Sequence, residues 1–241
     1  MAEFLAHALS RLPWARRKAP KLSHRNALLR LKALGFVPRT IYDIGAYRGG
    51  WARLASEVFP EAAFVLFEAN ADNAAYLSGR RHFTVALSAH DGEKPLFLPR
   101  EGDATGTSLY RENSAHYDPG NLVVRTVATA RLDTLVASER LPPPELVKID
   151  VQGAELDVIA GAKIALSRCE ALIAELSFAG YNKDAPLIGE TLPAITKLGF
   201  RCVDICELHR ADAGNVLQGD FLFVRPALFA AIGQASGLGG S

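Results

Sequence analysis

The sequence contains little cysteine: Cys169, Cys202 and Cys206 are its three thiols in 241 residues. They form no C-x-x-C pair, and no histidine pair lies nearby at zinc spacing. An odd, scattered set of this kind argues against a disulfide framework and a Cys–His zinc site. We therefore predict reduced, mostly buried thiols and a cytoplasmic protein.

The sequence also lacks an excess of either charge, since 27 Lys and Arg oppose 26 Asp and Glu. This balance gives no bulk attraction to nucleic acid, and we predict no nucleic-acid partner. No apolar run is long enough to cross a membrane. In residues 1–20 the basic residues follow the apolar part, which favours a short helix ending near Pro13 over a signal peptide. A surface-binding amphipathic segment is the alternative for this stretch.

Hydrophobic residues make up 49% of the chain, enough for a sizeable core. Apolar runs typical of buried strands alternate with helical patterns, which predicts a mostly parallel sheet with helices on both faces. We expect an N-terminal helical extension over 1–37, one domain over 38–230, and a flexible tail over 231–241. The predicted strands are 40–45, 63–69, 82–89, 146–151 and 171–178, with helices at 22–35, 49–58, 71–79, 155–166 and 187–198.

Two regions depart from the parallel pattern. Residues 91–136 contain a short strand, a long polar loop and a half-exposed strand with alternating polarity, which predicts an antiparallel insertion and a substrate loop. Residues 200–208 and 220–226 predict an antiparallel pair that closes the chain.

The most informative segment is IYDIGAYRGGW at residues 41–51, which predicts a strand, a glycine turn and a helix start. Such a turn lets a ligand approach the main chain. It lacks the G-x-G-x-x-G order and the G-K-S/T of a P-loop. Asp43 would repel the pyrophosphate of a dinucleotide, which disfavours a nicotinamide-dependent oxidoreductase.

Glu68 ends the next predicted strand, where a carboxylate can accept hydrogen bonds from both hydroxyls of a ribose. A surface helix cap is the alternative for Glu68. With Asp43 it favours a phosphate-free nucleoside that carries positive charge, and S-adenosylmethionine is such a ligand.

Several segments occur in an order that resembles the FkbM family of S-adenosylmethionine-dependent methyltransferases. They are IYDIGAYRGGWARLASEVFPEAAFVLFEAN, ALSAHDGEKPLF, TGTSLY, VATARLDTL and LVKIDVQGAELDVIAGA, within residues 38–226. The KIDVQGAE segment is the most specific of them. One departure is Ala69 after Glu68, where many members have proline. The resemblance implies a class I methyltransferase fold, with a Rossmann-like, mostly parallel sheet and an antiparallel C-terminal strand.

The resemblance also implies roles for individual residues. The cofactor contacts would be Asp43, Gly45, Ala46 and Gly49 at the methionine part, Glu68 and Asn70 at the ribose, Ser88 near the adenine, and Asp150 near the transferred methyl. Acceptor-side residues would be Thr107, Ser108, His116 and Gln152. Family members mostly methylate hydroxyl oxygens, so we expect a hydroxyl of a small molecule, sugar or glycan as acceptor.

A hydroxyl is a poor nucleophile until a base or a metal ion assists the loss of its proton. We favour Asp150 as that base, with Glu175 and His209 as further catalytic candidates, and Glu155 and His116 remain open. Each has a structural alternative, since a strand-end Asp often caps a helix and loop histidines are often solvated. Asp150 with Glu175 would also suit Mg²⁺, but no spacing assigns a metal ligand and we name none.

Other functions remain open at this stage. The chain could bind the cofactor as a regulatory or assembly protein without turnover, or methylate nitrogen or carbon. No D/N-P-P-Y motif of amine methylation is present. Exposed strand edges make a homodimer reasonable.

Overall fold

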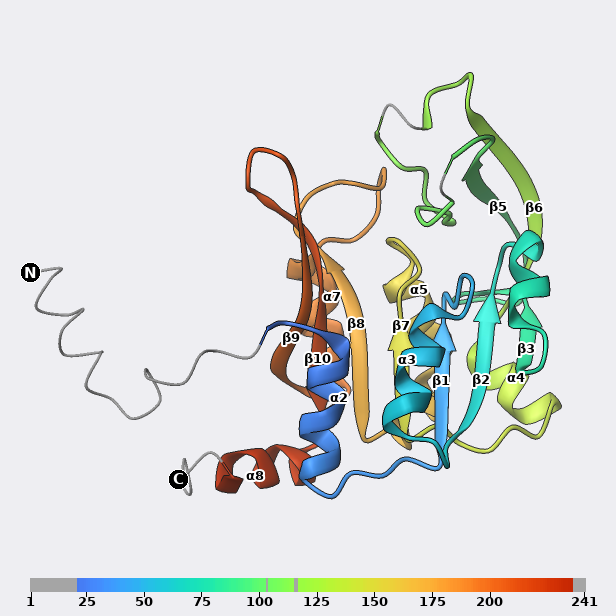
Figure 1. The fold of residues 1–241 in the computed structure, drawn as a ribbon. Helices are drawn as coiled ribbons and strands as arrows, with labels where there is room; N and C mark the ends of the chain where they lie inside the picture. The colour runs from blue at the N-terminus through green and yellow to red at the C-terminus, as the bar shows by residue number, and fades with distance from the viewer. Residues whose placement is uncertain (1–20, 103, 115–116, 236–241) are drawn as a thin grey trace, which may run out of the picture.

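A seven-stranded sheet forms the centre of the protein, with the strand order β3-β2-β1-β7-β8-β10-β9 (Figure 1). The computed structural model describes residues 21–102, 104–114 and 117–235. Strands β1, β2, β3, β7 and β8 pair in parallel, and β10 runs antiparallel to both β8 and β9. The predicted class I methyltransferase fold, including its antiparallel C-terminal strand, is confirmed.

The strands of this sheet are β1 (Thr40–Ile44), β2 (Ala63–Glu68), β3 (Arg81–Thr84), β7 (Leu146–Ile149), β8 (Ala171–Ser177), β9 (Arg201–Arg210) and β10 (Val216–Val224). The helices are α2 (His24–Ala33), α3 (Gly50–Val58), α4 (Leu132–Ser138), α5 (Glu155–Gly161), α6 (Lys163–Ser167), α7 (Ile188–Lys197) and α8 (Pro226–Ala235), with a 3₁₀ helix η2 (Ala71–Leu77).

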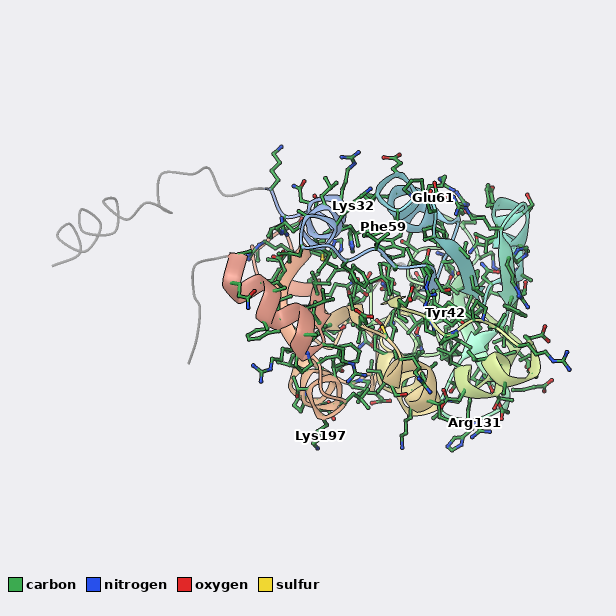
Figure 2. The ribbon with its side chains drawn as sticks, turned by 90° about the horizontal axis from the view of Figure 1, so that it is seen from below. Lys32, Tyr42, Phe59, Glu61, Arg131 and Lys197 are labelled. Atoms are coloured by element: carbon green, nitrogen blue, oxygen red, sulfur yellow. The ribbon has the colours of Figure 1, made fainter. Side chains whose placement is uncertain are left out.

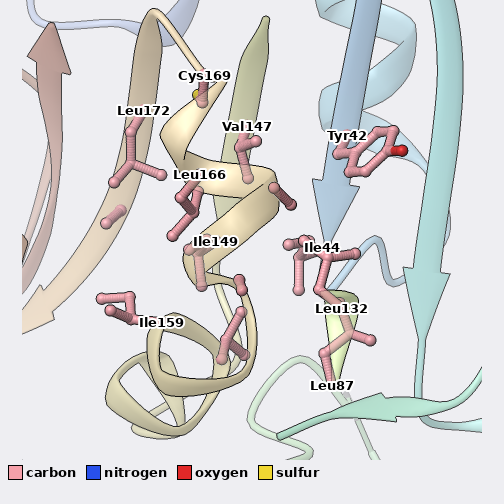
Figure 3. Close-up of a cluster of buried hydrophobic side chains, with 14 of the residues drawn as sticks. Tyr42, Ile44, Leu87, Leu132, Val147, Ile149, Ile159, Leu166, Cys169 and Leu172 are labelled. Atoms are coloured by element: carbon pink, nitrogen blue, oxygen red, sulfur yellow. The ribbon is translucent and has the colours of Figure 1, made fainter. Parts of the chain in front are cut away.

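The central strands are apolar because helices cover both of their faces. Every residue of β1 and β7 is buried. Side chains such as Ile41 and Ile173 pack against α2, α3 and α8 on one face. Tyr42, Val147 and Ile149 belong to the cluster with α4, α5, α6 and α7 on the other face (Figure 3). In the view from below, Tyr42 lies in the interior, whereas Arg131 and Lys197 lie at the edge (Figure 2).

A second, three-stranded sheet combines β4 (Ala86–Leu87), β6 (Leu122–Ala130) and β5 (Gly92–Pro99), and β6 is antiparallel to β5 as predicted. The predicted strand 82–89 is wrong as a single strand, because the chain leaves the large sheet after Thr84. The Val85 N–H still donates to the Glu68 carbonyl, but β4 pairs with β6. The predicted helix 155–166 divides into α5 and α6 at Ala162.

The segment 104–114 returns from the second sheet toward the carboxyl ends of the central strands (Figure 1). Ser108 exchanges backbone hydrogen bonds with Phe97, and Glu112 forms a bridge with Asn182. The loop is therefore attached on two sides, to β5 and to the segment after β8.

The first and last helices of the described chain, α2 and α8, both pack against the core. Leu28 and Leu31 of α2 share a core cluster with α3 and β1, and Leu228 of α8 belongs to the same cluster. Helix α8 continues to Ala235, past the predicted start of a flexible tail at 231. Within the described ranges, no helix is both long and apolar enough to span a membrane.

Candidate active site

A cavity of about 470 Å³ opens at the carboxyl ends of β1, β2, β7 and β8. Its walls come from the turn after β1, the ends of the strands and residues 104–109 of the loop. This volume lies in the range of small-molecule sites, and ligands of open α/β sheets bind at this edge. The position agrees with the site predicted from the sequence.

Asp43 is the most unusual group in the cavity wall. Its side chain is fully buried, and neither carboxylate oxygen accepts a hydrogen bond of normal geometry from the described residues. Burial raises the pKa of Asp43 to about 6, against the attraction of the Lys148 ammonium and the nearby Ala52 N–H. An unpaired buried carboxylate is costly, so this position favours a ligand that supplies a positive charge.

The glycine turn after β1 lines the cavity, but its first two N–H groups are already hydrogen-bonded and are not available to a ligand. Gly45 and Ala46 both donate to the Phe67 carbonyl, at 2.9 and 3.1 Å. Gly45 has φ +79°, and a Cβ there would lie 1.7 Å from the Asp150 carbonyl oxygen. Only glycine therefore allows the turn after β1 to cross so close to the turn after β7.

Glu68 lies at the end of β2 and is held by its surroundings. One carboxylate oxygen accepts from the Tyr47 N–H at 2.7 Å, and the other from the Asn70 N–H at 2.8 Å. Burial raises the pKa of Glu68, and these hydrogen bonds oppose that rise. Asn73 Nδ2 also donates to Oε1 at 3.4 Å, so it is Oε2 that retains acceptor capacity toward the cavity, because each carboxylate oxygen offers about two lone-pair sites.

A charged network connects β7 to β8. The Lys148 ammonium donates to Asp150 Oδ2 at 2.6 Å, and Gln152 Nε2 donates to Asp150 Oδ1 at 2.9 Å and Glu175 Oε2 at 2.6 Å. Burial by itself would raise the pKa of Asp150, but the charge and hydrogen bond of Lys148 together with the Gln152 hydrogen bond outweigh it, and the pKa is lowered. The lowered pKa makes Asp150 a weak base and disfavours it for the base role that we expected from the sequence.

The pKa of Glu175 is shifted in the opposite direction from that of Asp150. Gln218 Nε2 donates to its second oxygen at 2.6 Å. Burial and the neighbouring carboxylates Asp150, Asp220 and Glu155 raise the pKa of Glu175 well above its ordinary value. Of the two carboxyls, Glu175 is thus the better proton acceptor.

Most of the predicted site residues meet at the cavity. Those in its wall are Asp43, Gly45, Ala46, Glu68, Thr107, Ser108, Asp150, Gln152, Glu175 and His209. Ser108 also has a structural role, because its hydroxyl donates to the Gln152 carbonyl at 2.7 Å and holds the loop against the turn after β7.

Three predicted contacts lie behind the wall. Gly49 begins α3 with φ +70° and faces Leu77. Asn70 caps η2 and donates its N–H to Glu68, so it orients that carboxylate. Ser88 is fully buried and its backbone lies against Gly161, while Val85, Ala86 and Leu87 line the cavity instead. Glu155 holds the turn after β7 by accepting from the Val151 and Gly153 N–H groups. His116 lies outside the described residues.

Sequence reasoning missed several groups near the site. Lys148 was readable as a lysine within an apolar strand, two residues before Asp150 and so on the same face. Gln218 and Asp220 carry no local signal, because only the pairing of β10 with β8 brings them to Glu175.

The strand order, with β10 antiparallel beside β8, defines the fold of class I methyltransferases, and the cavity lies at the sheet edge where ligands of such folds bind. The match to known families is more specific: residues 43–202 match the Methyltransferase FkbM domain, about two thirds of the chain. The chain belongs to this family.

One curated relative and two of the similar solved structures are named as methyltransferases. The chain is 32% identical over 153 residues to the 2-O-methyltransferase NoeI of Sinorhizobium fredii, a match over 57% of this chain and 63% of the relative. The matched part thus spans less than two thirds of that protein.

Among solved structures, magnesium protoporphyrin IX methyltransferase of Synechocystis shares 11% identity at a TM-score of 0.47, covering 93% of this chain and 97% of that one. An O-methyltransferase of Bacillus cereus shares 12% at 0.45, covering 92% and 90%. Similarities of this size carry no functional argument.

Proposed function

We propose that the protein transfers a methyl group from S-adenosylmethionine to a hydroxyl oxygen of a small molecule or glycan. The single observation that carries the proposal is the buried, unpartnered carboxylate of Asp43 beside Glu68 in one cavity. Membership of the FkbM family supports the reaction class. The relative NoeI, a 2-O-methyltransferase, favours oxygen as the acceptor atom.

The residues present fit the cofactor. Asp43 offers negative charge to the cationic methionine part, and no described residue donates a hydrogen bond of normal geometry to it. Glu68 faces the cavity from the neighbouring strand and can accept hydrogen bonds from ribose hydroxyls. Apolar walls from Val85, Ala86 and Leu87 suit an adenine ring. When bound, the cofactor supplies an electrophilic methyl group on a sulfonium.

The acceptor would occupy the other end of the cavity, between β8, β9, β10 and the loop. Its oxygen must be placed near attack distance of the methyl carbon, at roughly 3 Å. Gln152 ties Asp150 to Glu175 there, and the loop residues Thr107 and Ser108 form part of the wall. Glu175 and His209 are the groups that we propose to receive the hydroxyl proton, because both line this end.

Binding of S-adenosylhomocysteine, measured by calorimetry, tests the cofactor part. Glu68→Gln keeps the shape of the side chain but removes its charge, and a lost charge-assisted bond costs about 1.5–3 kcal/mol. We expect binding to weaken about 10- to 150-fold, whereas the exposed Glu93→Gln control binds like the wild type. A wild-type protein that binds no cofactor, or a Glu68→Gln variant with unchanged affinity, would sink the proposal.

A panel of hydroxyl-bearing acceptors, including sugars with a free 2-hydroxyl, tests turnover through release of S-adenosylhomocysteine. Cofactor binding without turnover on any member would favour the regulatory or assembly alternative. The cytoplasmic location is part of the proposal, supported by three free cysteines of which Cys169 and Cys206 are buried. A homodimer stays a prediction, which sedimentation would test.

A further inference from the structure

Three carboxylates lie in a row across the last strands of the large sheet. In the strand pairing Glu175 of β8 is opposite Asp220 of β10, and Asp220 is opposite Glu207 of β9. Side chains that are directly opposite share one face of a sheet, and like charges there are destabilising. The first two of these residues are buried, so solvent does not relieve their repulsion.

Asp220 is the central member of the row and is only 3% exposed. Its Oδ1 has no hydrogen-bond partner among the described residues. Its Oδ2 lies 3.4 Å from Nε2 of His24 on α2. One oxygen of a buried carboxylate is therefore left unsatisfied, which is unusual in a folded protein.

The neighbours of His24 determine what that imidazole can do. The indole N–H of Trp51 donates to His24 Nδ1 at 3.2 Å. Since an indole nitrogen only donates, Nδ1 must be the acceptor nitrogen, and the proton of the ring lies on Nε2, facing Asp220. His24 is thus a donor that orients Asp220 and leaves Oδ1 available for another group.

His209 completes a compact set of ligand atoms. It lies on β9 opposite Gln218 of β10, two residues along each strand from the pair Glu207 and Asp220, and it lines the cavity. Single ligand atoms of Glu175, His209 and Asp220 all lie within 4.8 Å of one another. Atoms that far apart lie about 2.8 Å from a common centre, so each needs to move by about 0.6–0.8 Å to surround one ion at ordinary bond lengths of about 2.0–2.2 Å.

We propose that Glu175, His209 and Asp220 bind one divalent transition-metal cation, of the Mn²⁺ or Zn²⁺ kind, at the acceptor end of the cavity. One imidazole with two carboxylates suits these ions better than Mg²⁺, which prefers oxygen ligands alone. The pair Asp150 and Glu175, considered from the sequence, is less suited to a cation, because the Lys148 ammonium at 2.6 Å already balances the charge of Asp150 and would repel a metal ion there.

The local charge supports this site. Within the described part of the chain, Lys148 is the one buried lysine or arginine, and it faces the carboxylates of Asp43, Asp150 and Asp220. A divalent cation would offset the repulsion among the carboxylates, and Gln152 and Gln218 would hold Glu175 in orientation as outer-shell partners.

A metal ion at this site would have one consequence for the reaction, and that consequence rests on the proposed function. A cation beside the cavity would bind the acceptor oxygen and lower the pKa of its hydroxyl, whose proton would then pass to solvent water, so that Glu175 and His209 would act through the metal instead of as free bases. Metal binding itself does not depend on the proposed function, and it is measured without cofactor or acceptor.

Chelator-treated protein titrated with Mn²⁺ tests the inference, with free Mn²⁺ followed by electron paramagnetic resonance and Zn²⁺ as competitor. We expect one bound Mn²⁺ per chain, displaced by Zn²⁺, with nitrogen coupling from His209. Asp220→Asn and His209→Ala should each weaken binding at least tenfold. Asp220→Asn keeps the side-chain volume and removes a buried charge, so the variant should fold, as circular dichroism would verify.

Exposed residues of the same types serve as matched controls. Asp212→Asn and His90→Ala alter a carboxylate and an imidazole outside the cavity, and binding should be unchanged in both. Absence of Mn²⁺ and Zn²⁺ binding in the wild type would overturn the inference, as would equal losses in the site and control variants. If the wild type still binds S-adenosylhomocysteine in that case, the methyltransferase proposal survives without a metal.

Discussion

Asp43→Asn should stabilise the cofactor-free protein at neutral and alkaline pH. The carboxylate of Asp43 is buried and accepts no hydrogen bond of normal geometry from the residues that the structure describes, and burial raises its pKa from 3.8 to about 6. One pKa unit corresponds to about 1.36 kcal/mol, so keeping Asp43 ionised costs the folded state about 3 kcal/mol at pH 8. Asparagine has nearly the same shape and carries no charge, which removes that cost.

The dependence on pH has a definite sign. Between pH 3.8 and about 6 the folded state holds a proton on Asp43 that the unfolded state has released. The free energy of unfolding therefore falls through this window as pH rises. The difference between Asp43→Asn and wild type should be near zero around pH 4 and should reach about 3 kcal/mol in favour of the variant at pH 8.

Urea denaturation of protein freed of cofactor, at pH values from 4 to 8, measures this difference. Asp212→Asn, an exposed aspartate in the turn between β9 and β10, should show a small difference that does not change with pH. The same Asp43→Asn protein should lose affinity for S-adenosylhomocysteine, so stability and binding would change in opposite directions. A variant less stable than wild type at pH 8, or a difference independent of pH, would refute the reasoning.

The other predictions concern nearby groups. Lys148→Met should lower the free energy of unfolding by about 3–5 kcal/mol in urea denaturation, because it leaves buried carboxylates without their ammonium; a loss below about 1 kcal/mol would show that the network is hydrated. Gly45→Ala should prevent folding, seen by circular dichroism, since its Cβ would lie 1.7 Å from a carbonyl oxygen. Gly35→Ala, at a similar φ of +88° with open space, should cost only about 1–2 kcal/mol; equal effects would contradict a steric cause. Burial raises the pKa of Glu155 from 4.5 to about 7, so the folded state loses stability as pH rises through that window. Glu155→Gln keeps an oxygen for the two N–H donors and should raise the free energy of unfolding by about 3 kcal/mol above pH 8 in urea, with no gain near pH 4.

The local sequence pattern was sufficient to predict the central strands and the polar residues near their carboxyl ends. A parallel strand covered on both faces must be apolar along its length, so a polar residue at its carboxyl end is conspicuous. Asp43, Glu68, Asp150 and Glu175 were found in this way, and all four line the cavity. The prediction for Ser88 was less successful, because nothing in the sequence shows that the chain changes sheets after Thr84.

The roles of the carboxylates depended on their neighbours. Asp150 directly follows one apolar strand and Glu175 lies near the end of another, yet the pKa of Asp150 is lowered and that of Glu175 is raised. The difference comes from Lys148, whose ammonium pairs with Asp150 and leaves Glu175 with glutamine donors. A linear pattern contains the residue types but not these distances.

The sequence by itself determined the family and the parallel sheet, and it contained the residues of the proposed cofactor end, because strand ends and the glycine turn are local features. Only the tertiary structure brought together the residues of the proposed acceptor end, Glu175, His209 and Asp220, from three strands. Antiparallel pairing of β10 with β8 and β9 sets that register, and the docking of α2 brings His24 to Asp220. Strand register and helix docking depend on packing across the whole core. That packing brings groups that are far apart in the sequence to within a few ångströms of one another.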